Sequence, residues 1–206
     1  MSRAPLIHAE PVLLPESNWK SIPLASLLET VLNEIQGVLS RADEAGSQRL
    51  VEAIFAARQI VVHASGRMGI MSSAFAMRLA QLGFHSHALL EPTTPGLGRD
   101  DLLILSSASG ETQTVYQVAV LGKEHGVQIA LITARPDSRC GRLADITVKM
   151  PMFNKLSPQD SPASIQPMTT LSEQSLLVYF DLLVLWIMQA SGQTGEDLWE
   201  RHFNLE

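Results

Sequence analysis

The sequence predicts an α/β fold: a doubly wound, five-stranded parallel sheet flanked by helices. Three observations support this prediction. From residue 60 onward, short apolar runs alternate with segments whose apolar residues recur at helical spacing. Two of the runs, Leu102–Leu105 and Ile129–Ile132, are apolar throughout, which is typical of strands covered on both faces. Two of the runs are followed by loops rich in small residues, which parallel sheets present at the carboxyl ends of their strands, where ligands bind.

The elements follow from these patterns in order. Strands are expected at 60–63, 86–90, 101–105, 127–133 and 146–150. Helices are expected at 25–39, 47–57, 68–82, 112–125, 138–144 and 168–191, with a last helical turn or two at 196–202. Ser47 is a candidate N-cap of the second helix. Residues 1–20, interrupted by prolines, are expected to be irregular, and residues 21–206 to form a single domain.

Composition excludes several classes of protein. The net charge of −6 argues against binding to nucleic acid or to an anionic membrane surface. Cys140 is the only cysteine, so no intrachain disulfide can form, and a reducing cytoplasmic location is expected. The N-terminus has no signal-peptide profile. The apolar stretch 176–188 is interrupted by Asp181 and is too short to span a bilayer.

The most informative loop is Ser107–Thr112, directly after the apolar run at 102–105. A helix that starts here presents backbone N–H groups without intrahelical partners, and its dipole favours an anion. Ser107, Ser109 and Thr112 add hydroxyl donors, while Gly110 and Glu111 complete the loop as candidate substrate contacts. With no lysine in the loop, a phosphate monoester fits better than a triphosphate with magnesium. The same residues are also ordinary helix caps, and capping alone remains an alternative.

A second loop, Ala64-Ser65-Gly66-Arg67, follows the expected strand at 60–63. Gly66 permits close approach of a ligand to the backbone, and Arg67 carries a bidentate fork that suits phosphate. A glycine-containing turn with a solvated arginine is the simpler alternative. The two loops together predict a small-molecule phosphate site.

These motifs resemble the sugar isomerase (SIS) domain family, and within it the 6-phospho-3-hexuloisomerase branch. Most of the chain contributes to the resemblance. The matching segments are 64–69, 75–79, 82–84, 91–95, 107–112, 143–145, 166–170 with Glu173-Gln174, and the tail Arg201-His202-Phe203-Asn204-Leu205. The sequence departs from the usual pattern at Ala64, Met68, Thr169 and Ser172, and Met68 removes one hydroxyl donor.

The resemblance implies a SIS-type sheet in the flavodoxin-like strand order and a homo-oligomer, dimer or tetramer, with sites near subunit interfaces. It implies interconversion of D-arabino-3-hexulose 6-phosphate and fructose 6-phosphate through an enediol, with no metal or organic cofactor. Two alternatives stay open: an isomerase of a different phosphosugar, and a non-catalytic module that binds a sugar phosphate. The second is disfavoured because too few residues precede the domain for an attached DNA-binding segment.

Glu173 and His202 are the catalytic candidates. A buried carboxylate can carry a proton between the two carbons of an enediol, and the resemblance favours this role for Glu173 over simple stabilisation of the helix dipole. His202 could donate a proton to the carbonyl, or open the ring of fructose 6-phosphate. Being close to the C-terminus, it could also enter a neighbour's site. An exposed tail histidine is the alternative.

Overall fold

The computed structural model describes residues 21–153 and 158–205. Five parallel strands form one sheet with the order β2-β1-β3-β4-β5. They are β1 (Ile60–Ala64), β2 (Ser86–Ala88), β3 (Leu102–Ser106), β4 (Gln128–Thr133) and β5 (Ile146–Lys149). The predicted doubly wound parallel sheet and its flavodoxin-like order are confirmed, and the point where the strand order reverses lies between β1 and β3. The predicted irregular segment 1–20 is outside the described residues.

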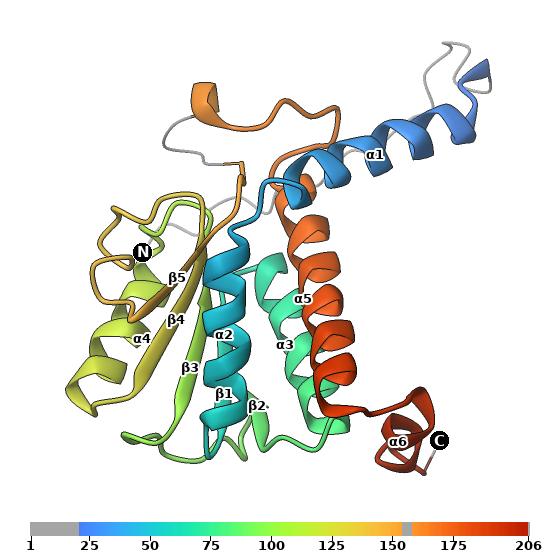
Figure 1. Ribbon diagram of the computed structural model, residues 1–206. Helices are drawn as coiled ribbons and strands as arrows, with labels where there is room; N and C mark the ends of the chain where they lie inside the picture. Colours follow the sequence, from blue (N-terminus) through green and yellow to red (C-terminus); the bar gives the residue numbers. More distant parts are fainter. Residues whose placement is uncertain (1–20, 154–157, 206) are drawn as a thin grey trace, which may run out of the picture.

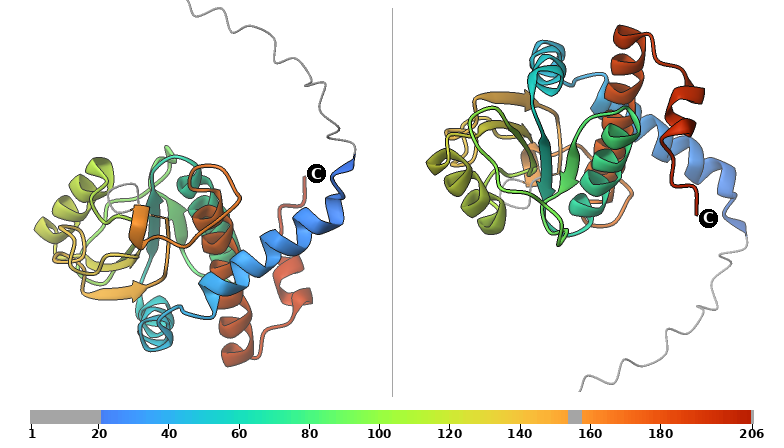
Figure 2. Two further views of the ribbon diagram at one scale, coloured as in Figure 1. Left: turned by 90° about the horizontal axis from the view of Figure 1, so that it is seen from above. Right: turned by 90° about the horizontal axis from the view of Figure 1, so that it is seen from below.

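Helices cover both faces of this sheet (Figures 1 and 2). On one face lies α4 (Gln113–Glu124), and on the other lie α2 (Glu44–Ala56) and α3 (Arg67–Gln81), with α5 (Thr170–Ser191) packed on α3. The first helix, α1 (Leu24–Leu39), contacts α5 with its own C-terminal end, and its N-terminal end projects away from the sheet (Figure 1). A 3-10 turn, η2 (Pro158–Asp160), precedes α5, and the short α6 (Gly195–Glu200) follows it.

Alternating side chains of the strands divide the core in two. Ile60 and Val62 pack toward α2, α3 and α5, whereas Val61 packs toward α4. The larger half is closed by Phe75 of α3 and Phe180 of α5, whose rings stack at 4.2 Å between centroids. This contact fixes α5 along α3 and so sets where the N-terminus of α5 lies.

Helix α5 is long and apolar enough to cross a bilayer, judged by length and composition alone. However, 56% of its most apolar window is buried inside the protein, and Asp181 is exposed on its outer face. The helix therefore packs as a core helix of the domain.

Two local predictions are wrong. Ser47 lies inside α2, whose N-cap is Asp43, and its hydroxyl donates to the Asp43 carbonyl and hydrogen-bonds Tyr179 Oη, each at 2.7 Å. Residues 138–144 form consecutive turns rather than a helix. Their polar groups bond across the fold, as when Cys140 N donates to the Gly110 carbonyl at 3.1 Å, so tertiary contacts replace the helical pattern.

We expect Phe180→Ala to lower the free energy of unfolding by about 3–5 kcal/mol, because the ring is fully buried and its removal leaves a cavity beside Phe75. Urea denaturation followed by circular dichroism measures this change. Leu121→Ala, at a side chain 55% exposed on α4, is the matched control and should change stability by about 0.5 kcal/mol or less. Equal losses in the two variants would contradict the assignment of the core.

Candidate functional site

A cavity of about 550 Å³ opens at the carboxyl ends of β1 and β3. Loops after both strands and the N-terminal end of α5 form its wall. The lining residues are Ser65, Gly66, Arg67, Met68, Ser106, Ser107, Ala108, Ser109, Glu111, Thr112, Phe153, Met168, Thr169 and Glu173. The two loops predicted to bind phosphate therefore meet at one cavity.

Three helices begin at this cavity. Helix α3 starts after Gly66, α4 after Thr112 and α5 after Thr169. At none of these three N-termini does a side chain among the described residues make the capping hydrogen bond. Helix N-termini carry unpaired N–H groups and partial positive charge, so their convergence favours an anion in the cavity.

The loop 107–112 is organised by its own hydroxyls. Ser107 Oγ accepts from the Gly110 amide at 3.1 Å and hydrogen-bonds Thr112 Oγ1 at 2.9 Å, and it is almost fully buried. Ser109 Oγ accepts from the Glu111 amide at 3.1 Å. Ser109 and Thr112 are partly exposed at the cavity, so their hydroxyls remain accessible to a ligand.

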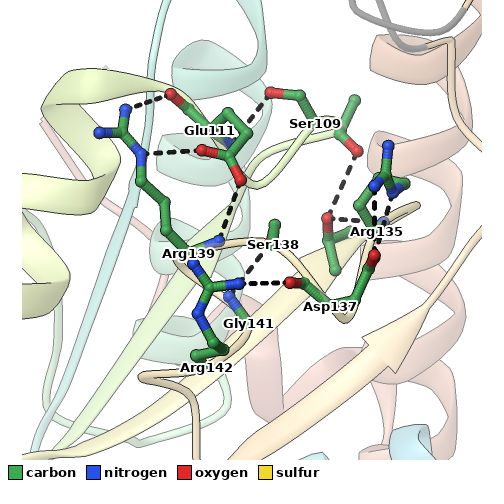
Figure 3. Close-up of polar contacts among 10 residues, drawn as sticks. Ser109, Glu111, Arg135, Asp137, Ser138, Arg139, Gly141 and Arg142 are labelled. Carbon is green, nitrogen blue, oxygen red and sulfur yellow. Dashed lines mark hydrogen bonds and ion pairs between the residues drawn. The ribbon is translucent and has the colours of Figure 1, made fainter.

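Gly110 and Glu111 shape this loop from behind. Gly110 has φ +63°, is buried and does not line the cavity, and a Cβ there would overlap Ser138 Oγ. The Glu111 side chain lines the cavity but is held by Arg139, whose Nε lies 2.9 Å from Oε2 and whose amide donates to Oε1 at 3.0 Å (Figure 3). Arg139 also stacks on the Tyr116 ring at 4.4 Å. The carboxylate of Glu111 therefore fixes the loop to the β4–β5 connection.

The loop after β1 lies beside it. Ser65 Oγ hydrogen-bonds Thr114 Oγ1 of α4, which joins the two loops. Gly66, at φ +63°, and Arg67 are exposed at the cavity, as expected for ligand contacts. Ala64, another predicted contact, is the last residue of β1, is buried and does not line the cavity.

Glu173 is a buried carboxylate in the first turn of α5, where the sequence predicts it, and it lines the cavity. Arg67 NH1 lies 2.7 Å from its Oε2, and Thr169 Oγ1 donates to its Oε1 at 2.7 Å. Arg67 also donates to Thr170 Oγ1 at 3.2 Å. The arginine predicted to bind phosphate thus directly contacts the predicted base.

His202 is not brought to this cavity within one chain. It lies after α6, at the opposite end of α5 from Glu173, with its ring 4.9 Å from that of Trp199 (Figure 1). There it borders a separate cavity of about 320 Å³ with Arg78 and Gln81. Any role of His202 at the described cavity therefore requires a second copy of the chain.

Several lining residues were missed by sequence reasoning. Ser106 is only 2% exposed, and its hydroxyl has no hydrogen-bond partner among the described residues, so it is free to bind a ligand. It lies between the predicted strand 101–105 and the loop 107–112, and the sequence indicated no role for it. Nothing in the sequence around Phe153 indicates a binding residue. Met168 lies in the segment 166–170 that resembles the family, but no role was predicted for it. No group of three or more potential metal-ligating side chains occurs within residues 21–153 and 158–205.

The fold and cavity define a class: an α/β domain with a cavity at the switch point of a parallel sheet, where three helix N-termini and a buried carboxylate meet. Residues 53–180 match the SIS domain family, and the chain belongs to that family.

Relatives cover nearly the whole described domain. The 3-hexulose-6-phosphate isomerase of Bacillus subtilis is 36% identical over 85% of this chain and 95% of its own length. The enzyme of that name from Mycobacterium gastri is 32% identical over 87% of this chain and 89% of its own. The crystal structure of a protein of Methanococcus jannaschii, for which the function 3-hexulose-6-phosphate isomerase was inferred, superposes with a TM-score of 0.73 at 32% identity. It covers 88% of this chain and 99% of that one.

We expect Gly110→Ala to weaken binding of fructose 6-phosphate by about tenfold or more. A side chain at positive φ costs about 1–2 kcal/mol, and the new Cβ would also push the loop 107–112 away from Ser138. Isothermal titration calorimetry measures the affinity. Gly96→Ala is the matched control, since a Cβ there meets no atom within 4 Å, and it should bind like the wild type. Unchanged affinity in Gly110→Ala would contradict a role of this loop in binding.

Proposed function

We propose that this protein is a sugar-phosphate isomerase that interconverts D-arabino-3-hexulose 6-phosphate and fructose 6-phosphate. The observation that carries the proposal is the position of Glu173, a buried carboxylate at a cavity where three uncapped helix N-termini converge. Such a cavity combines a binding site for an anion with a carboxylate that can act as a base. The names of the relatives from Bacillus subtilis and Mycobacterium gastri support the same reaction.

The phosphate is assigned to the N-terminal end of α4. Amides of the first turn, together with the hydroxyls of Ser109 and Thr112, provide donors there, and Ser106 adds a buried hydroxyl. A phosphate monoester needs several donors and no metal, which agrees with the side chains present. The sugar carbons then extend toward Glu173 on the facing wall.

The chemistry is a proton transfer between neighbouring carbons. Glu173 removes the proton from C2 of the 3-ketose, which gives an enediolate across C2 and C3, and then returns a proton to C3. The proton on O2 moves to O3, so the carbonyl ends at C2. Arg67, which is half exposed, can offset the negative charge of the enediolate oxygens.

We assign the transfer of the proton from O2 to O3 to His202 of a second copy of the chain. The outer face of α1 supports such an assembly: Leu24, Leu28 and Leu32 are 81%, 56% and 55% exposed on a helix that projects from the domain. Leu185 and Trp186 of α5 are exposed as well. Apolar stripes of this kind mark interfaces between protein chains, and we take this α1 stripe as the contact with a second copy.

An isomerase of another phosphosugar is the second candidate. It is favoured by Met68, whose thioether side chain lines the cavity where the family pattern has a serine hydroxyl. An apolar group in place of a hydroxyl donor changes which sugar hydroxyls can form hydrogen bonds with the protein, and this change favours a different substrate.

Incubation of the protein with fructose 6-phosphate in deuterium oxide tests the reaction. We expect the C3 proton signal to decay as the 3-ketose forms, because the proton that Glu173 removes from C3 exchanges with deuterium oxide at the carboxyl group before a deuteron returns to carbon. In Glu173→Gln the exchange rate should fall by about 10²–10⁴-fold, since the amide cannot act as a base. Proton NMR follows both rates.

Asp181→Asn, an exposed residue of the same helix, is the control and should exchange at the wild-type rate. Exchange at C1 in place of C3 would identify an aldose–ketose isomerase and favour the second candidate. No exchange at either carbon, with binding intact, would contradict an isomerase and leave a module that binds sugar phosphates.

Co-expression of Glu173→Gln with His202→Asn tests the exchange of residues between copies. Each variant alone should be nearly inactive. If His202 acts in a neighbour's cavity, one site of each mixed dimer retains both groups, and random pairing restores about one quarter of wild-type activity. Activity no higher than that of the separate variants would contradict the shared site.

Leu28→Glu should convert the assembly to monomers in light scattering and abolish this complementation, because the charge disrupts the apolar stripe of α1. Leu121→Glu places the same charge on α4 at a side chain 55% exposed, close to the 56% of Leu28, and should change neither readout. A wild-type chain that is monomeric would contradict the second-copy assignment.

A further inference from the structure

The segment that leads into α5 is attached to α1 by one carboxylate. Glu34, on α1, accepts three hydrogen bonds from consecutive residues: from Ser164 Oγ at 2.7 Å, from the Ile165 amide at 2.8 Å and from Gln166 Nε2 at 2.9 Å. These contacts span about 130 positions of the sequence, so they join segments that are far apart in the chain.

Among the residues that the structure describes, few contacts besides those of Glu34 hold residues 163–166 in place. Ala163, Ser164 and Ile165 are exposed, with the Ile165 side chain 60% accessible, so burial contributes little to its position. Among the described residues, the hydrogen bonds found from 163–166 to the rest of the protein all end at Glu34; a further one, from the Gln166 amide to Ser164 Oγ, is internal.

The attachment lies close to the site. Only three residues separate Gln166 from Thr170, the first residue of α5. The first is Pro167, whose ring restricts its own backbone and that of Gln166. The second is Met168, at φ +56°, the one non-glycine residue with positive φ in the described chain. The third is Thr169, which donates to Glu173. A short, conformationally restricted link of this kind transmits a shift at Gln166 to the catalytic carboxylate.

The charge of Glu34 fits this role. Partial burial opposes its ionisation, but hydrogen bonds from Gln166, Ser164 and Ile165 outweigh that effect, so the pKa of Glu34 lies below its ordinary value. A carboxylate accepts all three donors at once through its two oxygens, whereas an amide side chain has one accepting oxygen and no charge.

We propose that Glu34 is a positioning residue that holds segment 164–169 against α1 and thereby fixes Thr169 and Glu173 at the cavity. The inference rests on the proposed isomerase function of that cavity. Glu34 itself does not line the cavity. If α1 binds a second copy, the same carboxylate connects that contact to the site.

A double-mutant cycle tests the proposal on the full chain. The variants are Glu34→Gln, Ser164→Ala and their combination, with Glu29→Gln on the same helix as control because Glu29 is exposed and makes none of these contacts. We expect kcat/KM to fall by about 10- to 100-fold in Glu34→Gln, since small misplacements of reacting groups have effects of this size. Ser164→Ala should lower kcat/KM by a smaller factor. The double variant should match Glu34→Gln, because both substitutions disrupt the same hydrogen bond between Ser164 and Glu34.

Amide hydrogen–deuterium exchange of residues 162–170 gives a readout that does not depend on turnover. Exchange should accelerate there in Glu34→Gln and remain at the wild-type rate in Glu29→Gln. Unchanged exchange, or unchanged kcat/KM despite faster exchange, would overturn the positioning role while leaving the isomerase function intact. If the wild type binds fructose 6-phosphate without turnover, the proposed function fails. The double-mutant cycle is then measured with the dissociation constant of fructose 6-phosphate. A weaker affinity in Glu34→Gln supports the positioning role, and an equal affinity overturns it.

Discussion

The parallel pairing of β1 with β3 is the constraint on which the site depends. Because the two strands run in the same direction and are neighbours, the loops that follow them open at one edge of the sheet, and α3 and α4 begin side by side. The hydrogen bond between Ser65 and Thr114 joins these two helix starts directly. The N-terminus of α5 reaches the same edge through packing rather than strand order, since Phe180 stacks on Phe75 of α3. Three helix N-termini therefore face one cavity, although they come from parts of the chain about 100 residues apart.

This arrangement explains how a protein of net charge −6 can attract an anion. Helix dipoles act over the first turn and are strongest where water is partly excluded, so their effect is local and does not depend on overall charge. The cavity also contains an acidic group, Glu173, whose position in the first turn of α5 would weaken the anion site if it were uncompensated. Arg67 lies 2.7 Å from it and supplies the compensation. A phosphate seat and a carboxylate base can thus share one cavity.

The sequence predicted the parallel sheet and most helix bounds, because these depend on periodicity and on small-residue loops that are local in the chain, whereas the strand order followed from the resemblance to the family. It failed where tertiary contacts decide. Residues 138–144 have a helical pattern but form turns, since the amides of Arg139 and Cys140 donate to Glu111 and Gly110 of the loop 107–112. The sequence placed Glu111 among the candidate substrate contacts, and the residue does line the cavity, but nothing in the sequence indicates that its charge is paired with Arg139. Ser106 and Glu34 could not be identified, because nothing near them in sequence indicates a free buried hydroxyl or a contact with residue 165.

The two members of the central ion pair differ in how firmly they are held, and this difference suits the chemistry. The Glu173 side chain is 8% exposed and is fixed by Thr169, whereas that of Arg67 is 52% exposed and extends from the start of α3. A base that transfers a proton between adjacent carbons must stay within hydrogen-bond distance of both, so it benefits from a rigid support. A cation that offsets charge must follow that charge from the carboxylate to the enediolate oxygens, and a long, partly solvated side chain can do this. In the proposed isomerisation, the buried carboxylate therefore serves as the fixed group and the exposed guanidinium as the adjustable one.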